Sequence, residues 1–177
     1  METTRAILLR KTRLGDTSLI LTWLTSDHGK IKTVAKGSLR PKNPFAGMLD
    51  LFFDCEITYA RSKKTELHNL RETRLRHTRD GIRNDYPRLA LASYFIELIE
   101  HSTEHDHPAP ELHDLLARAL DHLDQKPATR RALLHFEKEL TRHLGIAQPG
   151  VTPIIAYGRA HHRIPAARPG LIKSLPE

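Results

Sequence analysis

The chain has 177 residues, enough for one domain or two small ones, and 39% of them are apolar, which suffices to build a core. Its 28 lysines and arginines outnumber its 21 aspartates and glutamates, so the net charge is +7 with histidine neutral. The single cysteine, Cys55, excludes an internal disulfide and a zinc site built from cysteines.

The excess of positive charge lies entirely in the first 80 residues. They hold 16 basic and 9 acidic residues, whereas the remainder of the chain holds 12 of each. Such asymmetry predicts that the N-terminal part faces nucleic acid or another anionic surface. The chain shows no signal peptide, and no stretch approaches the roughly 18 apolar residues of a membrane-spanning helix. We therefore expect a cytoplasmic protein.

The first 80 residues are typical of a β-domain. The expected strands cover residues 5–9, 17–25, 29–35, 50–60 and 66–75. In the third of these, Ile31, Thr33 and Ala35 point to one face while the lysines and Val34 point to the other. Five short strands with long connections favour a small closed barrel, for which the OB-fold is the common architecture.

From residue 86 onward the apolar spacing becomes that of helices, which we expect over 86–101, 111–123 and 129–144. Gly145 is placed to end the third of them. After it the periodicity disappears and five prolines follow. The predicted fold class is therefore α+β, with a five-stranded OB-fold over residues 1–80, a small helical bundle over 81–148 and an irregular proline-rich tail over 149–177.

The strongest indication of function is the segment from residue 30 to residue 42, which carries five positive charges and no acidic residue. Its cations are Lys30, Lys32, Lys36, Arg40 and Lys42. A charge run is most often only a solvated face. This one follows a strand of a predicted OB barrel, in the half that holds all the net charge, and we interpret it as a contact for nucleic-acid phosphates.

Two further basic clusters are weaker candidates for the same contact. Arg10, Lys11 and Arg13 follow the first strand, and residues 61–64 form a basic turn with Arg61, Lys63 and Lys64. Hairpin tips are often basic for solubility alone, so both alternatives stay open for these two clusters.

Aromatic side chains in strands can stack on nucleic-acid bases. Trp23, Phe53 and Tyr59 lie where a core has to be filled, and we expect them to be buried. Phe45 and Phe52 lie near the basic segment and remain candidates for stacking.

No enzymatic motif is present, neither a phosphate-binding glycine loop nor a nucleophile elbow. The chain has twelve histidines, among them His101, His105 and His107 and the pair at 161–162. They lack the spacing of a metal site, because three or four ligands must converge on the ion. We expect a protein that is not an enzyme and that needs no metal or cofactor.

A series of short segments, in order along the chain, resembles the RecO family of bacterial recombination mediators. In the N-terminal half they are residues 6–10 (Ala-Ile-Leu-Leu-Arg), 14–18 (Leu-Gly-Asp-Thr-Ser), 24–30 (Leu-Thr-Ser-Asp-His-Gly-Lys), 34–37 (Val-Ala-Lys-Gly) and 40–42 (Arg-Pro-Lys). In the helical half they are residues 91–98 and the pattern Phe-Glu…Leu…Leu-Gly over 136–145. The resemblance covers about residues 1–148.

The resemblance implies an OB-fold followed by a helical domain, and a role in DNA repair and recombination. Members of the family bind single- and double-stranded DNA, anneal complementary strands and, with RecR, help to load RecA onto DNA coated by single-strand DNA-binding protein. Carried over by position, Lys36 and Arg40 are the best candidates for DNA contact, and the nucleoid is the expected location.

The family's helical domain also docks the acidic, apolar C-terminal tail of the single-strand DNA-binding protein. Such a site needs an apolar groove with a cationic rim, for which the third helix offers Arg130, Arg131, His135 and Arg142.

The sequence also departs from the family pattern. Many members carry a four-cysteine zinc module after the Leu-Gly signature, and no cysteine occurs there in this chain, which suggests a short variant without that module. The competing hypotheses are an RNA-binding OB-fold interaction module without a recombination role and, more remotely, a metal-dependent hydrolase that uses the histidines.

Overall fold

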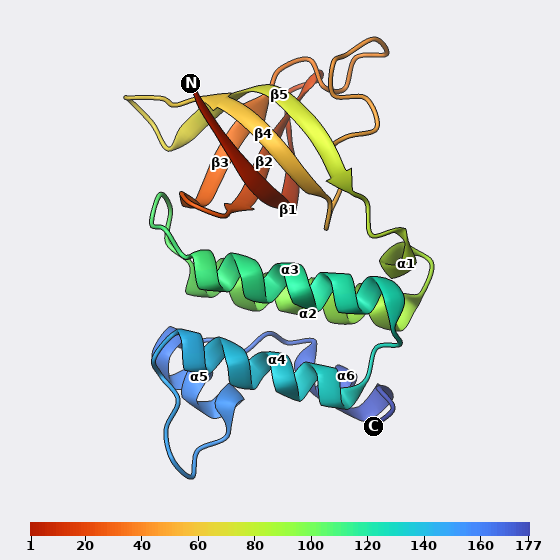
Figure 1. The fold of residues 1–177 in the computed structure, drawn as a ribbon, viewed down its shortest axis with the longest axis vertical. Helices are drawn as coiled ribbons and strands as arrows, with labels where there is room; N and C mark the ends of the chain where they lie inside the picture. Colours follow the sequence, from red (N-terminus) through yellow and green to blue (C-terminus); the bar gives the residue numbers. More distant parts are fainter. The chain divides into compact units, whose positions relative to one another are not determined.

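The computed structural model describes residues 1–177, which form two compact units. The barrel unit comprises Met1–Thr78 together with Thr103–His113, and the helical unit comprises Arg79–Ser102 together with Asp114–Glu177 (Figure 1). The first unit therefore consists of the predicted β-domain and a short segment from between two helices.

Five strands close the barrel in the order β1-β2-β3-β5-β4. They are β1 (Glu2–Leu14), β2 (Ser18–Thr25), β3 (Gly29–Ala35), β4 (Asp54–Ala60) and β5 (Leu67–His77). β3 and β5 run parallel, and every other neighbouring pair is antiparallel. This arrangement confirms the predicted α+β class with an N-terminal OB-fold.

β1 extends well beyond the five residues that its apolar run indicated, because it pairs with two neighbours. Its residues from Glu2 to Ile7 pair with β4, and those from Ala6 to Leu14 pair with β2. The register with β2 shifts between Leu8 and Arg10. A bulge of this kind bends a strand, which lets β1 close the barrel.

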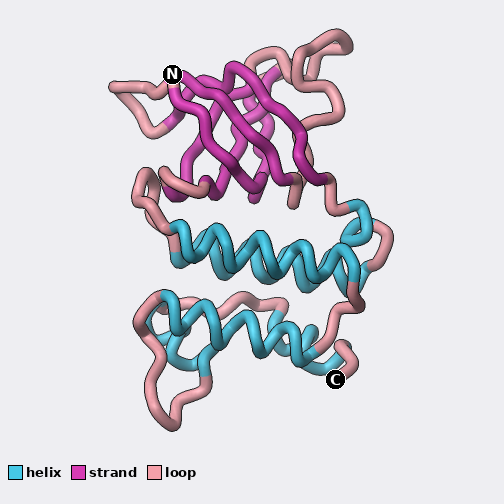
Figure 2. Tube along the Cα trace, in the orientation of Figure 1, coloured by secondary structure: helices cyan, strands magenta, loops and turns pink.

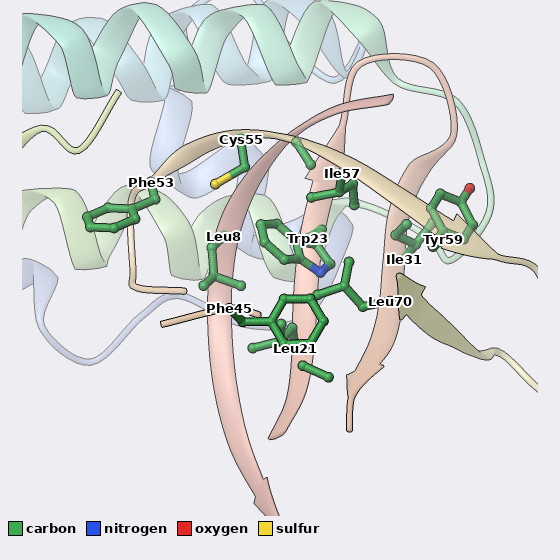
Figure 3. Packing of buried hydrophobic residues seen from close by; sticks show 12 residues of the cluster. Leu8, Leu21, Trp23, Ile31, Phe45, Phe53, Cys55, Ile57, Tyr59 and Leu70 are labelled. Atoms are coloured by element: carbon green, nitrogen blue, oxygen red, sulfur yellow. The ribbon is translucent and has the colours of Figure 1, made fainter. Parts of the chain in front are cut away.

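The interior of the barrel is filled by alternate side chains of its strands. On β3, Ile31, Thr33 and Ala35 are buried as predicted. Trp23 is fully buried and its indole Nε1 donates a hydrogen bond of 2.9 Å to Thr33 Oγ1. Figure 3 shows Phe45 beside Trp23, so the loop after β3 contributes to the same core.

The segment Thr103–His113 packs on the barrel at the start of β3. The backbone N–H of Asp106 donates to the carbonyl oxygen of Lys30 at 3.0 Å, and His105 forms an isolated parallel bridge with Lys30. Arg61, in the loop after β4, donates to Asp106 Oδ1 at 2.7 Å. The helical domain predicted over residues 81–148 is therefore interrupted by a segment that belongs to the barrel unit.

The helical unit is built from six helices, one of which begins in the barrel unit. They are α1 (Asp80–Arg83), α2 (Tyr86–Ser102), α3 (Pro110–Gln125), α4 (Arg130–His143), α5 (Pro153–His161) and α6 (Arg168–Ser174). Phe95 of α2 stacks on Phe136 of α4 with ring centroids 4.0 Å apart. Thr129 caps α4, because its hydroxyl oxygen accepts from the backbone N–H of Ala132.

The structure corrects the irregular tail predicted over residues 149–177, which contains α5 and α6 (Figure 2). Pro153 and Pro169 lie in the first turns of these helices, where a residue without an N–H group loses no helical hydrogen bond. The tail is also anchored, since Tyr157 Oη donates to the carbonyl oxygen of Leu98 at 2.7 Å. The prolines that led us to expect an irregular tail therefore lie at the beginnings of two helices.

Candidate nucleic-acid interface

β3 and the turn after it position the cations of the basic segment. Lys30 and Lys32 alternate with the buried residues of β3 and are half-buried, whereas Lys36, Arg40 and Lys42 are exposed. The alternation follows from the two-residue period of a strand. Positive charge thus continues from the outside of the barrel wall into the turn.

Hydrogen bonds tie this turn to the hairpin between β1 and β2. The backbone N–H of Gly37 donates to Ser18 Oγ at 3.1 Å, and that of Leu39 donates to the carbonyl oxygen of Thr17 at 2.9 Å. Within the turn, the N–H of Arg40 donates to the carbonyl oxygen of Gly37 at 3.0 Å. These bonds hold the backbone that carries Lys36 and Arg40 in one place.

A pocket of about 420 Å³ lies between the turn and the hairpin, and Lys36 and Arg40 both line it. None of its lining residues is acidic. Neither cation takes part in an ion pair, and the same holds for Lys32 and Lys42. This surface, which we call the cationic pocket, is lined by Leu14, Thr17, Ser18, Val34, Lys36, Gly37 and Arg40.

The electrostatic effect of the neighbouring lysines is visible at His105. Its pKa is lowered from 6.5, first by burial and then by the positive charges of Lys30 and Lys32. Lys30 and Lys32 thus place positive charge at the start of β3, and the nearby carboxylates of Glu66 and Asp106 partly offset it.

The second basic cluster is only partly available for contact with a ligand. Lys11 Nζ lies 2.6 Å from Asp50 Oδ1 and donates to the carbonyl oxygen of Leu49, so an internal carboxylate balances its charge. Arg10 and Arg13 are exposed. Arg13 precedes Leu14 on β1 but does not itself line the cationic pocket.

The third cluster lies elsewhere on the barrel. Figure 1 shows the loop after β3 and the loop after β4 on different sides of the barrel. Arg61 is paired with Glu2 and Asp106, while Lys63 and Lys64 are exposed. The structure thus does not bring this cluster together with Lys36 and Arg40.

The structure removes Phe45 and Phe52 as candidates for stacking on bases. Phe45 is 6% exposed and Phe52 is 2% exposed, so neither offers a face to a base. The other aromatic side chains of the barrel strands and loops, Trp23, Phe53 and Tyr59, are also buried, as predicted. No phenylalanine, tyrosine or tryptophan of the barrel unit is therefore exposed for stacking.

Sequence reasoning missed two groups of residues on the barrel. The first is the wall of the cationic pocket formed by Thr17 and Ser18, whose hydroxyls in a hairpin next to a basic turn could have indicated it. The second is a row of exposed arginines on β5, formed by Arg71, Arg74 and Arg76. Arg74 lies 3.7 Å from Glu56, whereas neither Arg71 nor Arg76 has an ion-pair partner.

A second pocket, of about 600 Å³, lies in the helical unit between α2, α3 and α4. Ala119, Pro127 and Ala132 contribute accessible apolar surface to it, and the buried rings of Phe95 and Phe136 lie beneath. Its cationic side chains are Arg118, Lys126 and Arg131, next to His122 and His135. An apolar groove with a cationic rim is thus present, and its lining contains no acidic residue.

Two of the four residues assigned to this rim do not line it. Arg130 lies against the end of the chain, where its backbone N–H donates to Pro176 and its side chain lies 3.7 Å from Glu177. Arg142 pairs with Glu139 at 2.7 Å. Arg131 and His135 line the pocket, as do Lys126 and Arg118, the last of which is paired with Asp114 at 2.9 Å.

No group of three or more His, Cys, Asp or Glu side chains in residues 1–177 is arranged to hold a metal ion. No helix combines the length and the apolar character needed to cross a membrane.

Comparison with models of known protein families shows to which family the chain belongs. The family model "Recombination protein O N terminal" matches residues 1–79, and "Recombination protein O C terminal" matches residues 83–149. The chain belongs to the RecO family.

Curated relatives of this family align with most of the chain. DNA repair protein RecO of Rhodopirellula baltica is 36% identical over 140 residues, which are 79% of this chain and 52% of that protein. DNA repair protein RecO of Desulfatibacillum aliphaticivorans is 37% identical over 129 residues, with 72% and 50% covered. That of Pelobacter propionicus is 33% identical over 144 residues, with 81% and 58% covered. The chain spans about half the length of these relatives.

Proposed function

We propose that this chain binds DNA through its barrel unit and acts in DNA repair. The observation that carries the proposal is the cationic pocket, which both Lys36 and Arg40 line and whose lining contains no acidic residue. Phosphates attract such cations without regard to base sequence, and each neutralised phosphate releases counterions. Membership of a family whose curated members are named DNA repair proteins supports the role in repair.

The contact surface extends from the cationic pocket along β3. Lys36 and Arg40 make the central contact, and Lys30, Lys32 and Lys42 lie next to them in the basic segment. Arg10 and Arg13 extend the surface on β1. Lys11 contributes less, because Asp50 already balances its charge.

The mechanism is electrostatic and non-enzymatic. Cations on one barrel hold two complementary strands and reduce their mutual repulsion, so that base pairing can begin and the strands anneal. With RecR as a partner, the same activity supports the loading of RecA onto single strands coated by single-strand DNA-binding protein. Strand annealing and assistance to RecA loading are the activities of a recombination mediator.

Replacement of both central cations tests the proposal. The double variant Lys36→Glu with Arg40→Glu is expected to weaken binding of single-stranded DNA by at least about tenfold, because two phosphate contacts become repulsive. The matched control is Lys63→Glu with Lys64→Glu, which makes the same charge change in the loop after β4. An equal loss of DNA affinity in both double variants would mean that the net charge of the chain, and not this particular surface, determines DNA binding.

The competing function is an RNA-binding module without a role in recombination. DNA and RNA oligonucleotides of one sequence distinguish the two, because the 2′-hydroxyl is the group by which proteins recognise RNA. Tighter binding of the RNA strand, together with an absence of strand annealing, would favour this alternative.

A second function is favoured by the pocket of the helical unit. We propose that it receives the acidic, apolar C-terminal tail of the single-strand DNA-binding protein. Ala119, Pro127 and Ala132 offer apolar contact to such a tail, and Lys126 and Arg131 offer charge partners for its carboxylates.

A further inference from the structure

The lining of the cationic pocket is chemically divided. Leu14 and Val34 form an apolar part, and Leu14 is 41% exposed although it is a leucine in a strand. Thr17 and Ser18 bring hydroxyl groups, and Lys36 and Arg40 bring positive charge. A ligand that fits this lining has one apolar face and one anionic group.

The polar part of the pocket is rich in hydrogen-bond donors. Ser18 Oγ accepts a hydrogen bond from the N–H of Gly37, and this leaves the hydroxyl hydrogen of Ser18 to be donated. The ammonium group of Lys36 and the guanidinium group of Arg40 can only donate. Such a set of donors suits the oxygens of a phosphate group.

The barrel lacks the usual device by which OB-folds prefer single strands. That device is a set of exposed aromatic side chains on which unpaired bases stack. Trp23, Phe45, Phe52, Phe53 and Tyr59 are all buried here. Any preference of this barrel for single strands must therefore come from another part of its surface.

We propose that the cationic pocket holds one unpaired nucleotide of a DNA strand, an inference that rests on the proposed DNA-binding function. The phosphate lies between Lys36 and Arg40, and the base lies against Leu14 and Val34. The pocket's volume of about 420 Å³ falls within the range of small-ligand sites. A base in a duplex must first unstack and unpair, at a cost of about a few kcal/mol, so the pocket favours single-stranded DNA.

The test compares a fluorescent oligothymidylate with an abasic strand of equal length and with a duplex, in an anisotropy titration at fixed salt. The wild-type chain is expected to bind the oligothymidylate roughly three- to tenfold more tightly than the abasic strand, the range expected for a base buried against a partly exposed leucine. Leu14→Ser should remove this difference. Leu39→Ser should keep it, because Leu39 is similarly exposed (42%) in the turn after β3 but does not line the pocket.

The outcomes separate this inference from the function on which it rests. Equal affinity of the wild-type chain for the oligothymidylate and the abasic strand would overturn the proposed nucleotide pocket, and this comparison needs no variant. So would a difference that survives in Leu14→Ser. In both cases the DNA-binding proposal stands if the double variant Lys36→Glu with Arg40→Glu binds both strands more weakly than the wild-type chain does. If that double variant bound both strands as tightly as the wild-type chain, the DNA-binding proposal would fail, and so would the proposed nucleotide pocket.

Discussion

The backbone carbonyl oxygen of His107 occupies the space in which a side chain at Gly29 would begin. A β-carbon on Gly29 would lie 1.8 Å from that oxygen, and Gly29 has a φ of +70°. This close approach is how the segment Thr103–His113 reaches the first residues of β3, and it can be tested by substitution.

Gly29→Ala is expected to lower the free energy of unfolding by about 2–4 kcal/mol, since it adds a steric clash to the cost of a left-handed backbone. Gly15→Ala is the matched control. Gly15 also has a positive φ, of +59°, but nothing lies within 4 Å of the β-carbon position, so about 1 kcal/mol is expected. Urea denaturation measures both. Equal effects in the two variants would contradict the close packing at His107.

A buried ion pair anchors the C-terminal tail to α4. Glu137 is 2% exposed, and its Oε1 accepts from Arg168 Nε at 2.6 Å and from Tyr94 Oη at 2.6 Å. Burial, together with the adjacent negative charge of Glu137, raises the pKa of Tyr94, so its hydroxyl remains a donor.

Arg168→Met is expected to lower the free energy of unfolding by about 3 kcal/mol, because it leaves the buried carboxylate of Glu137 without its cation. Arg163→Met is the control. Its partner Glu97 lies 3.4 Å away in a solvent-exposed pair, which is worth at most about 1 kcal/mol. Thermal unfolding compares the two variants. A loss in Arg168→Met no greater than in the control would contradict the anchoring role.

The stability of the helical unit should fall in mild acid because of His161. Burial first, and then the nearby His101 and His162, lower the pKa of its imidazole. Neither the Nε2 atom of His161 nor the Nδ1 atom of His101 has a hydrogen-bond partner. The ring of Tyr157 also lies next to His161, with the two ring centroids 4.5 Å apart.

Below its unfolded pKa of 6.5, the unfolded chain takes up the proton of His161 more readily than the folded chain does. The contribution of neutral His161 to the free energy of unfolding is thus complete above pH 6.5 and is lost as the pH falls toward the lowered pKa of the folded state. His161→Gln should reduce the fall in melting temperature between about pH 7 and pH 5. An unchanged pH dependence in His161→Gln would refute this explanation.

The strands and helices with regular periodicity were predictable from sequence. The alternation of Ile31 and Thr33 with lysines indicated β3, and the apolar spacing of Leu133, Phe136 and Leu140 indicated α4. These patterns were sufficient because each element buries one face, and burial imposes its period on the sequence.

The parts that sequence reasoning missed depend on contacts between distant residues. Arg61 and Asp106 are 45 positions apart, and no local pattern indicated that they pair. Phe45 lies in a loop next to cations, yet it is buried in the core, which removed it from the candidate interface. Arg130 and Arg131 are adjacent in sequence, but helical geometry directs only Arg131 into the pocket.

The pocket of the helical unit should bind a synthetic peptide with the acidic, apolar tail of the single-strand DNA-binding protein. Arg131→Glu is expected to weaken binding by roughly tenfold, because a charge partner in the rim becomes repulsive. Arg142→Glu makes the same charge change on α4 outside the pocket and should have little effect. Isothermal titration calorimetry measures both, and equal affinities of the two variants would contradict the assignment of this pocket.

The salt dependence of single-stranded DNA binding tests the central claim most directly. If Lys36 and Arg40 each neutralise one phosphate, Lys36→Met with Arg40→Met should reduce the slope of log affinity against log salt by about 1.4. Lys11→Met, whose parent lysine is already paired with Asp50, should leave the slope nearly unchanged. A slope in the double variant equal to that of the wild-type chain would show that DNA does not bind at the cationic pocket.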